Sequence, residues 1–288
     1  MEHSILIADS GSTKTAWALL MPDGKSQTFT GKGINPFMLS QKELEALLRK
    51  EVCPQVEICS TTIENVFFYG AGCRGGEESK VVTDALRNTL RVENVSVYSD
   101  LLGAAHALWG RTSGIACILG TGSASCYYDG KQIVKNVPSL GYILGDEGSG
   151  AIVGKALVNE LFKGTLPSEI HDSFLQVCPK GIEDVLRRVY KEPFANRFLA
   201  SLVGTVVAPH RDRPEIQALL KNEFKKFFDR NIRHYGEPSL PIGFVGGLAF
   251  HFEEELRAVA AEEGYRVAQI LKNPLEGLCS MYMEGTLK

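Results

Sequence analysis

The chain has 288 residues, a formal net charge of −3 and a hydrophobic fraction of 44%, all ordinary values for a water-soluble globular protein. This length suits one large domain or two medium ones, and the lack of a basic excess argues against an extended nucleic-acid interface. Seven scattered cysteines without a CxxC pair indicate reduced thiols rather than a disulfide framework or a zinc site.

The N-terminal sequence MEHSILIADS has no basic segment followed by a long apolar stretch, so it does not resemble a signal peptide. No apolar run approaches the roughly 20 residues that a membrane-spanning helix needs. We therefore expect a cytoplasmic protein without a membrane or nucleic-acid partner.

The first part of the chain alternates short apolar strands with turns and helices. Short apolar runs predict strands at residues 5–8, 15–21, 27–30, 66–69 and 95–98. Capping signals and helical spacing predict helices at residues 40–51, 77–91 and 99–108.

The same order of strand, small-residue turn, strand, turn and strand restarts after residues 110–114. Strands are predicted at residues 115–119, 124–128, 132–135, 242–245 and 266–271. Helical sequence dominates residues 149–235 and is predicted again at 249–263 and 274–287. Alternating strands and helices favour an α/β protein, with domains at 1–110 and 111–288 and a closing helix that packs back on the first domain.

Three turns rich in small residues follow predicted strands and could hold phosphate groups. They contain Gly11, Ser12, Thr13 and Lys14 in the first turn, Gly120, Thr121, Gly122 and Ser123 in the second, and Gly246 and Gly247 in the third. Glycine allows backbone N–H groups to approach an anion, and the hydroxyl and ammonium groups add further donors.

Asp9 ends the first strand, directly before the first of these turns. A carboxylate repels phosphate unless a divalent cation lies between them, and Mg²⁺ typically keeps most of its waters beside one or two carboxylates. We therefore predict that Asp9 holds Mg²⁺ through water, although an isolated Asp-x-Gly turn is more often a simple hairpin.

There is no GxxxxGK[ST] sequence and no GxGxxG after the first strand, which argues against P-loop and Rossmann proteins.

With these turns in this order, the sequence resembles the superfamily of sugar kinases, heat-shock ATPases and actin. Within it, the sequence is similar to the BadF/BadG/BcrA/BcrD ATPase family and specifically to its N-acetylglucosamine kinases. The matching segments are DSGSTKTAWALL, GKGINPF, YGAGCRGG, YSDLLGAAHAL, CILGTGSASCYYDG, SLGYILGDEGSGAIVGKA and FVGGLAF, in the expected order. The resemblance implies two ribonuclease-H-like domains with mixed five-stranded sheets flanked by helices, a cleft between them, ATP and Mg²⁺ as cofactors, and a homodimer.

The resemblance also implies roles on the acceptor side. Asp100 becomes the predicted catalytic base and a sugar contact, whereas the sequence alone supports a helix N-cap equally well. Asn35 and Asp146 are implied sugar ligands, although the sequence alone is also compatible with a turn residue and with a charge near a helix start. Gly141 lies in the same substrate-binding segment, after Leu140, where the family often has an aromatic residue.

We predict ATP-dependent phosphorylation of an amino-sugar hydroxyl, with N-acetylglucosamine to N-acetylglucosamine 6-phosphate as the first choice. The acceptor stays open between N-acetylglucosamine, glucosamine, N-acetylmannosamine and a muramic derivative. One alternative is an ATPase activator of the 2-hydroxyacyl-CoA dehydratase type, which holds an iron–sulfur cluster between two subunits. The cysteines do not form that pattern. Another alternative is a sugar-binding regulator without catalysis.

Overall fold

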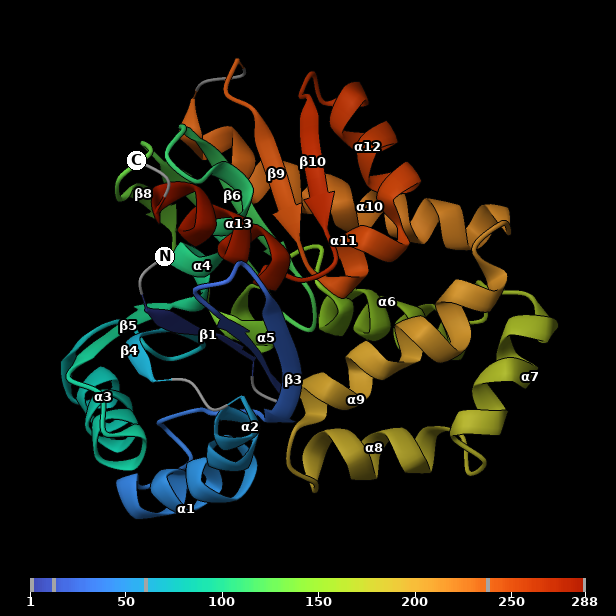
Figure 1. The fold of residues 1–288 in the computed structure, drawn as a ribbon. Helices are drawn as coiled ribbons and strands as arrows, with labels where there is room; N and C mark the ends of the chain where they lie inside the picture. The colour runs from blue at the N-terminus through green and yellow to red at the C-terminus, as the bar shows by residue number, and fades with distance from the viewer. Residues whose placement is uncertain (1–2, 12–13, 60–61, 237–238, 287–288) are drawn as a thin grey trace. The chain divides into compact units, whose positions relative to one another are not determined.

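The computed structural model describes residues 3–11, 14–59, 62–236 and 239–286, and the chain folds into two compact units (Figure 1). Unit 1 comprises Met1–Thr112, Gly130–Gln132 and Asn273–Lys288, and unit 2 comprises Ser113–Asp129 and Ile133–Lys272. Each unit is built on one mixed five-stranded sheet with helices, which confirms the predicted fold class.

The sheet of unit 1 has the strand order β3-β2-β1-β4-β5. Its strands are β1 (Ser4–Ser10), β2 (Lys14–Leu20), β3 (Ser26–Lys32), β4 (Ile63–Gly70) and β5 (Asn94–Ser99). β2 is antiparallel to β1 and β3, whereas β1, β4 and β5 run parallel. The parallel strands therefore end at one edge of the sheet, where Asp9 pairs with Tyr69 and Gly70 pairs with Ser99.

Helices cover this sheet on both faces because alternate side chains of its strands are apolar on each side. The helices are α1 (Gln41–Glu51), α2 (Cys53–Ile58), α3 (Gly76–Leu90), α4 (Asp100–Trp109) and α13 (Leu275–Thr286). Leu6 and Trp17 belong to the core that includes residues of α1 and α3. Ile7 and Leu20 belong to a second core that includes Leu278 of α13.

The sheet of unit 2 repeats the same plan with the order β10-β9-β6-β7-β8. Its strands are β6 (Gly114–Leu119), β7 (Ser123–Tyr128), β8 (Ile133–Val137), β9 (Ile242–Val245) and β10 (Val267–Leu271). β7 is antiparallel to β6 and β8, and β6, β9 and β10 are parallel. The two halves thus share one topology, as the repeated order of elements predicts.

The helical segments of unit 2 lie mainly between β8 and β9 in the chain. They are α5 (Gly141–Leu144), α6 (Gly150–Lys163), α7 (Ser168–Val177), α8 (Ile182–Tyr190), α9 (Ala195–Leu202), α10 (Pro214–Arg230), α11 (Gly247–His251) and α12 (Glu253–Glu262), with the short η1 (Val203–Val207), η2 (Ala208–His210) and η3 (Ile232–Tyr235). α10 packs beside α12, and three phenylalanines, Phe227, Phe228 and Phe244, form a ring cluster under it.

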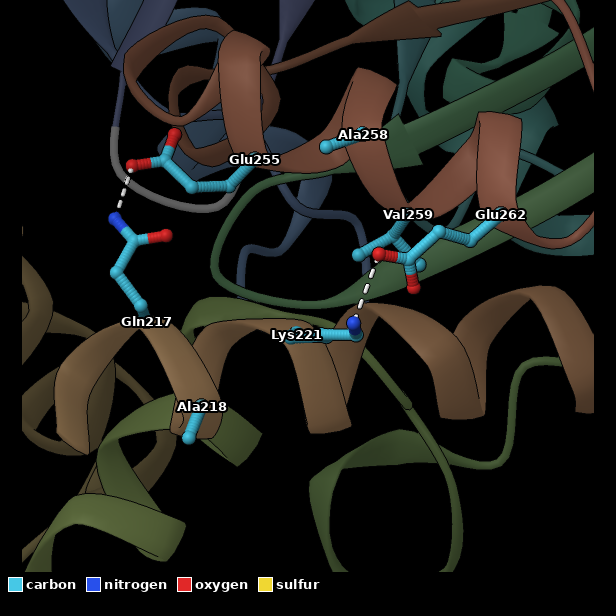
Figure 2. Close-up of a pocket in the computed structure, with 7 residues that line it drawn as sticks. All are labelled: Gln217, Ala218, Lys221, Glu255, Ala258, Val259 and Glu262. Atoms are coloured by element: carbon cyan, nitrogen blue, oxygen red, sulfur yellow. Dashed lines mark hydrogen bonds and ion pairs between the residues drawn. The ribbon is translucent and has the colours of Figure 1, made fainter. Parts of the chain in front are cut away.

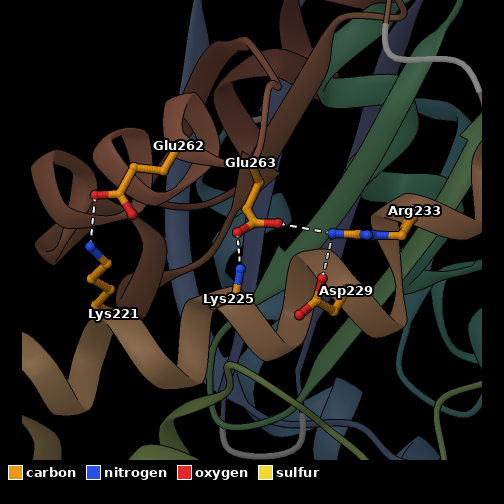
Figure 3. Close-up of polar contacts among 6 residues, drawn as sticks. All are labelled: Lys221, Lys225, Asp229, Arg233, Glu262 and Glu263. Carbon is orange, nitrogen blue, oxygen red and sulfur yellow. Dashed lines mark hydrogen bonds and ion pairs between the residues drawn. The ribbon is translucent and has the colours of Figure 1, made fainter.

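Ion pairs connect α10 and the following η3 to the end of α12 (Figure 3). Lys221 contacts Glu262 at 2.8 Å, Lys225 pairs with Glu263, and Arg233 contacts Glu263 at 2.9 Å. Arg233 also contacts Asp229 at 2.6 Å. The basic side chains are about half exposed, so each pair contributes little, and the apolar core beneath supplies most of the packing energy.

The helix predicted over 249–263 is in fact two helices, α11 and α12, which meet at Phe252. The prediction failed there because the buried Phe252 fits a continuous apolar pattern although its backbone is not helical. Pro54 lies beyond the end of α1, in the first turn of α2, where its missing N–H is not needed. Among the described residues, no helix is long and apolar enough to cross a membrane.

Candidate functional site

Asp9 and Asp100 lie together at the carboxyl edge of the unit 1 sheet. Asp9 is near the end of β1, and Asp100 directly follows β5, two strands away. Burial raises the pKa of Asp9 to about 7; the nearby Asp100 carboxylate adds to this rise and Lys14 opposes it. Two carboxylates and an ammonium group therefore share one partly buried edge. Such a pair fits hydrated Mg²⁺, which uses one or two carboxylates together with phosphate oxygens.

Ser99, not Asp100, is the N-cap of α4. The Ser99 hydroxyl accepts a hydrogen bond from the N–H of Leu102 at 3.2 Å, and Asp100 is the first helical residue. Asp100 Oδ1 accepts the N–H of Leu101 at 2.8 Å. The N-cap interpretation of Asp100 is therefore wrong, because a neighbouring hydroxyl already caps the helix, and Asp100 is not needed for that purpose.

The carboxyl of Asp100 has a raised pKa, and burial is the cause. The Leu101 N–H and the Arg74 guanidinium oppose this rise. Arg74 follows β4 in the Gly-rich turn before α3, within the segment YGAGCRGG, and no local sequence pattern predicts its role beside Asp100. Cys73, beside it, has its pKa raised to about 12 by burial and by Asp100, so its thiol stays protonated and unreactive.

The loop that carries Asn35 is attached to the end of β1 by Ser10. The buried Ser10 hydroxyl accepts the N–H of Ile34 at 2.9 Å and lies 3.1 Å from the Ile34 carbonyl oxygen. It also lies 2.8 Å from the Thr15 hydroxyl, which donates to the carbonyl of Lys32 at 2.9 Å. Ser10 was not among the predicted site residues, because a serine in a strand gives no local signal of a contact 24 residues away.

Asn35 forms the turn that its position before proline predicts. Its Oδ1 accepts the N–H of Phe37 at 3.0 Å. Gly72, with φ +86°, lies under this turn: a Cβ there would be 2.9 Å from the Phe37 ring and 3.4 Å from Asn35 Oδ1. Gly72 precedes Cys73, which is close enough to Asp100 for the two groups to influence one another. The structure therefore brings Asn35 to the same edge of unit 1 as Asp100.

In the first predicted phosphate turn, the N–H of Gly11 donates to the carbonyl of Lys14 at 3.1 Å. Lys14 opens β2 and is exposed. Ser12 and Thr13, the hydroxyl residues of this turn, lie outside the described residues. The described part of the turn places Lys14 close enough to Asp9 for its charge to oppose the rise in the pKa of that carboxyl.

The second turn, Gly120 to Ser123, is held by the start of α6. The N–H groups of Gly150 and Ala151 donate to the carbonyls of Gly120 and Thr121, at 2.8 and 3.1 Å. The carbonyls therefore face α6. An anion at this turn would use the backbone N–H and hydroxyl groups instead.

The third turn abuts the second. Gly246 has φ +134°, and a Cβ there would overlap the carbonyl of Leu119, directly before Gly120. Only glycine fits this close approach between the ends of β6 and β9. Gly247 opens α11, and a Cβ on it would meet no atom within 4 Å. Unit 2 thus brings its two predicted nucleotide-binding turns together at the carboxyl ends of neighbouring parallel strands.

Asp146 lies on the second turn. A Cβ on Gly122 would be 2.9 Å from Asp146 Oδ2, and the carboxylate accepts the backbone N–H groups of Ser123 and Gly141. Burial raises the pKa of Asp146 and Glu147 adds to the rise, whereas these two N–H groups oppose it. Asp146, a predicted sugar-binding residue, is thus in contact with the predicted phosphate-binding residues Gly122 and Ser123, and also with Gly141. No local sequence pattern predicts this contact, because Asp146 and Ser123 lie far apart in the chain.

A shallow groove of about 220 Å³ lies between α10 and α12 (Figure 2). It is lined by Gln217, Ala218, Lys221, Glu255, Ala258, Val259 and Glu262. Gln217 donates to Glu255 at 3.1 Å, and Lys221 donates to Glu262 at 2.8 Å. Because these polar groups pair with one another, the groove resembles an ordinary packing contact between two helices. In the part of the chain that the structure describes, no group of three or more His, Cys, Asp or Glu residues could hold a metal ion.

No protein-family model matches this sequence, and the search of curated proteins gave no match. Solved structures do match. A protein from Porphyromonas gingivalis, described as a "putative N-acetylglucosamine kinase", is 43% identical with a TM-score of 0.92, covering 98% of this chain and 99% of its own. One from Chromobacterium violaceum with the same description is 18% identical with a TM-score of 0.75, covering 97% and 98%. The ethanolamine utilization protein EutJ from Carboxydothermus hydrogenoformans is 15% identical with a TM-score of 0.57, covering 96% and 87%.

The two sheets of identical topology, with glycine turns at the carboxyl ends of their parallel strands, define an actin-like ATPase fold. The identity of 43% over nearly the whole of both chains is decisive for the family. The chain belongs to the N-acetylglucosamine kinase-like family that the Porphyromonas gingivalis structure represents.

Proposed function

We propose that this protein is an ATP-dependent sugar kinase that transfers the γ-phosphoryl group to a hydroxyl of an amino sugar. N-acetylglucosamine, giving N-acetylglucosamine 6-phosphate, is the first candidate acceptor. The single observation that carries the proposal is the pair Asp9 and Asp100 at one sheet edge, in a chain of this family. One carboxylate can serve the metal and the other the acceptor hydroxyl.

In unit 1, Asp9 would hold Mg²⁺ through water, and Gly11, Ser12, Thr13 and Lys14 would contact phosphate oxygens. Bound Mg²⁺ supplies charge neutralisation on the phosphates. Asp100 accepts the proton of the acceptor hydroxyl, and Asn35 orients the sugar ring. Burial raises the pKa of Asp100, and Arg74 opposes that rise, which favours the ionised form that a base needs.

In unit 2, Gly120, Thr121, Gly122 and Ser123 would bind nucleotide phosphates. Gly246 and Gly247 would let the adenosine side of the nucleotide approach the backbone. Asp146 and Gly141 would contact sugar hydroxyls. Phosphoryl transfer depends mostly on positioning and charge neutralisation, so a set of oriented donors and one base is sufficient chemistry.

The test is ADP release from Mg-ATP with a panel of hexoses, amino sugars and N-acetylated amino sugars, beside a control without acceptor. ADP formed only with one amino-sugar class would support the kinase and identify its acceptor. Equal ADP formation without acceptor would favour a partner-driving ATPase, and an iron content measured after anaerobic purification would test that alternative. No ADP with any acceptor would contradict the proposal and favour a sugar-binding protein without catalysis.

We also propose the cellular location and the oligomeric state of the protein. We place the protein in the cytoplasm, where ATP is available, and we propose that it forms a homodimer. Light scattering coupled to size-exclusion chromatography would test the second point, because a monomer of 31.5 kDa and a dimer of twice that mass are easily separated.

A further inference from the structure

Residues 139–149 are attached to the second phosphate turn through a small number of polar contacts. The Ser139 hydroxyl donates to the carbonyl of Ser123 at 2.9 Å. The carboxylate of Asp146 accepts the N–H of the same residue, Ser123, and the N–H of Gly141. Both backbone groups of Ser123 are therefore in contact with this one segment.

The Asp146 carboxylate lies where an anion would bind this turn. Its Oδ2 would be 2.9 Å from a Cβ on Gly122, so the glycine is what allows the carboxylate to approach the backbone. Negatively charged oxygens that accept backbone N–H groups at a glycine turn bind as phosphate oxygens do. Asp146 thus satisfies internally a donor that a nucleotide phosphate would otherwise use.

The backbone around Asp146 is held in an unusual conformation. Asp146 has φ +58°, one of three positive-φ residues other than glycine in the described chain. Gly141 and Gly148, on either side of it, also have positive φ, at +74° and +72°. This region costs energy for a residue other than glycine, although aspartate tolerates it better than most, so surrounding contacts help to hold Asp146 there. The contact with Ser123 is one such constraint, so its loss would allow the segment to relax.

Little apolar packing holds the middle of this segment. Ile143 and Leu144 of α5 are 71% and 73% exposed, and α5 has no buried residue. Segments with few buried apolar contacts open at a low free-energy cost. The C-terminal end is better fixed, because Ser149 caps α6 and Glu147 pairs with Arg230 at 3.0 Å. Residues 139–146 can therefore move while α6 stays in place.

Asp146 cannot bind both Ser123 and a sugar hydroxyl with the same oxygen, and a phosphate cannot bind the Ser123 N–H while Asp146 does. We infer that Asp146 occupies one nucleotide-phosphate position on the Gly122–Ser123 turn in the nucleotide-free protein, and that nucleotide binding releases it to the sugar. This inference rests on the proposed function. It makes Asp146 a positioning residue that couples the two substrates, with nucleotide binding first.

The inferred release of Asp146 requires positive coupling between the binding of nucleotide and the binding of sugar. If nucleotide releases Asp146, nucleotide and sugar each tighten the binding of the other by the same factor, and couplings of this kind typically amount to about 5- to 150-fold. Asp146→Ala removes the competing anion. It should therefore bind Mg-ADP at least about fivefold more tightly than the wild type and lose the coupling to the sugar.

The experiment is calorimetric titration of the full chain with Mg-ADP, and then with N-acetylglucosamine in the presence and absence of Mg-ADP. Glu147→Gln is the matched control, because it removes one negative charge at the next residue, from a side chain that pairs with Arg230 instead of the turn. It should change the affinity for Mg-ADP less than about twofold. Circular dichroism of each variant verifies that it is folded.

Hydrogen exchange gives a second readout that does not depend on the variants. In the wild type, Mg-ADP alone should slow exchange in peptides covering residues 120–124 and speed it in peptides covering 139–146. Unchanged exchange at 139–146, or an Asp146→Ala variant that binds Mg-ADP no better than the wild type, would overturn the inference. These outcomes leave acceptor-dependent ADP formation intact, whereas failure of the proposed function would abolish it in the wild type.

Discussion

At the scale of single residues, the two carboxylates of unit 1 differ in what surrounds them. Asp9 lies near Lys14 and Asp100, and burial with the second carboxylate raises its pKa to about 7. Burial also raises the pKa of Asp100, but there the Leu101 N–H and the Arg74 guanidinium oppose the rise. Two carboxylates in different environments can take different roles, one as the metal anchor and the other as the base. Two predictions follow from this difference.

Asp100→Asn should reduce kcat by about 10²- to 10⁴-fold, because an amide cannot accept the proton of the acceptor hydroxyl. The dissociation constant for Mg-ATP should change little. Both are measured on the purified variant, by ADP release with the identified acceptor and by titration. Asp23→Asn, the same change at an exposed hairpin carboxylate, serves as the control and should keep wild-type kcat. A wild-type rate in Asp100→Asn would show that another group is the base.

Asp9→Asn should stabilise the fold at alkaline pH. The pKa of Asp9 is higher in the folded chain, at about 7, than its ordinary value of 3.8, so ionisation destabilises the native state as pH rises through this range. The variant should exceed the wild type by on the order of 2–4 kcal/mol at pH 8, and the difference should fade as the pH drops below the ordinary pKa of 3.8. Urea unfolding at several pH values measures this. Equal stabilities at pH 8 would contradict the raised pKa.

At the scale of elements, small residues set how closely helices pack. In unit 2, a Cβ on Gly154 of α6 would overlap the carbonyl of Leu199 in α9. In unit 1, a Cβ on Gly277 of α13 would overlap the carbonyl of Ala107 in α4. In both places the obstacle is backbone, which cannot move aside as a flexible side chain can. The helices would have to separate, and the packing around them would be lost.

Gly154→Ala should therefore destabilise the protein by about 1–3 kcal/mol or more, although alanine is the better helix former. Gly204→Ala is a suitable comparison, because a Cβ at Gly204 would meet no atom within 4 Å. It should be neutral or slightly stabilising. Thermal unfolding of both variants beside the wild type measures the difference. A Gly154→Ala protein as stable as Gly204→Ala would show that α6 and α9 are not so closely packed.

At the scale of the whole molecule, each unit has its own apolar core, and the end of the chain returns to the first one. α13 follows β10 of unit 2 in the sequence, yet Leu278 packs in unit 1 with Ile7 and Leu20. The ring of Tyr282, also in α13, stacks on Phe67 of β4 at 4.1 Å. The core of unit 1 therefore requires residues from both ends of the chain.

Leu278→Ala and Leu256→Ala should consequently affect different parts of the protein. Both leucines are fully buried, and each truncation should cost about 2–5 kcal/mol. Leu278→Ala should increase hydrogen exchange in peptides from β1 and β2, and Leu256→Ala should increase it in peptides from α10 and β9. If Leu278→Ala raised exchange only in unit 2 peptides, the assignment of α13 to the unit 1 core would be wrong.

The sequence by itself determined the local features of this protein. Short apolar runs, capping pairs and glycine turns predicted the five strands of each sheet, the start of α1 and the position of Asp9 at a strand end. These features depend on neighbours within a few residues, so the periodicity of the sequence contains them. The family resemblance added the topology that joins them.

Only the tertiary structure decided which of these features meet. It placed Arg74 near Asp100, attached Ile34 to Ser10, and gave the N-cap of α4 to Ser99. It also placed the Asp146 carboxylate on the turn that contains Ser123. Most of these contacts join residues more than 20 positions apart. They form because parallel strands end at a common edge and cores exclude water, and neither condition is visible in any short stretch of sequence.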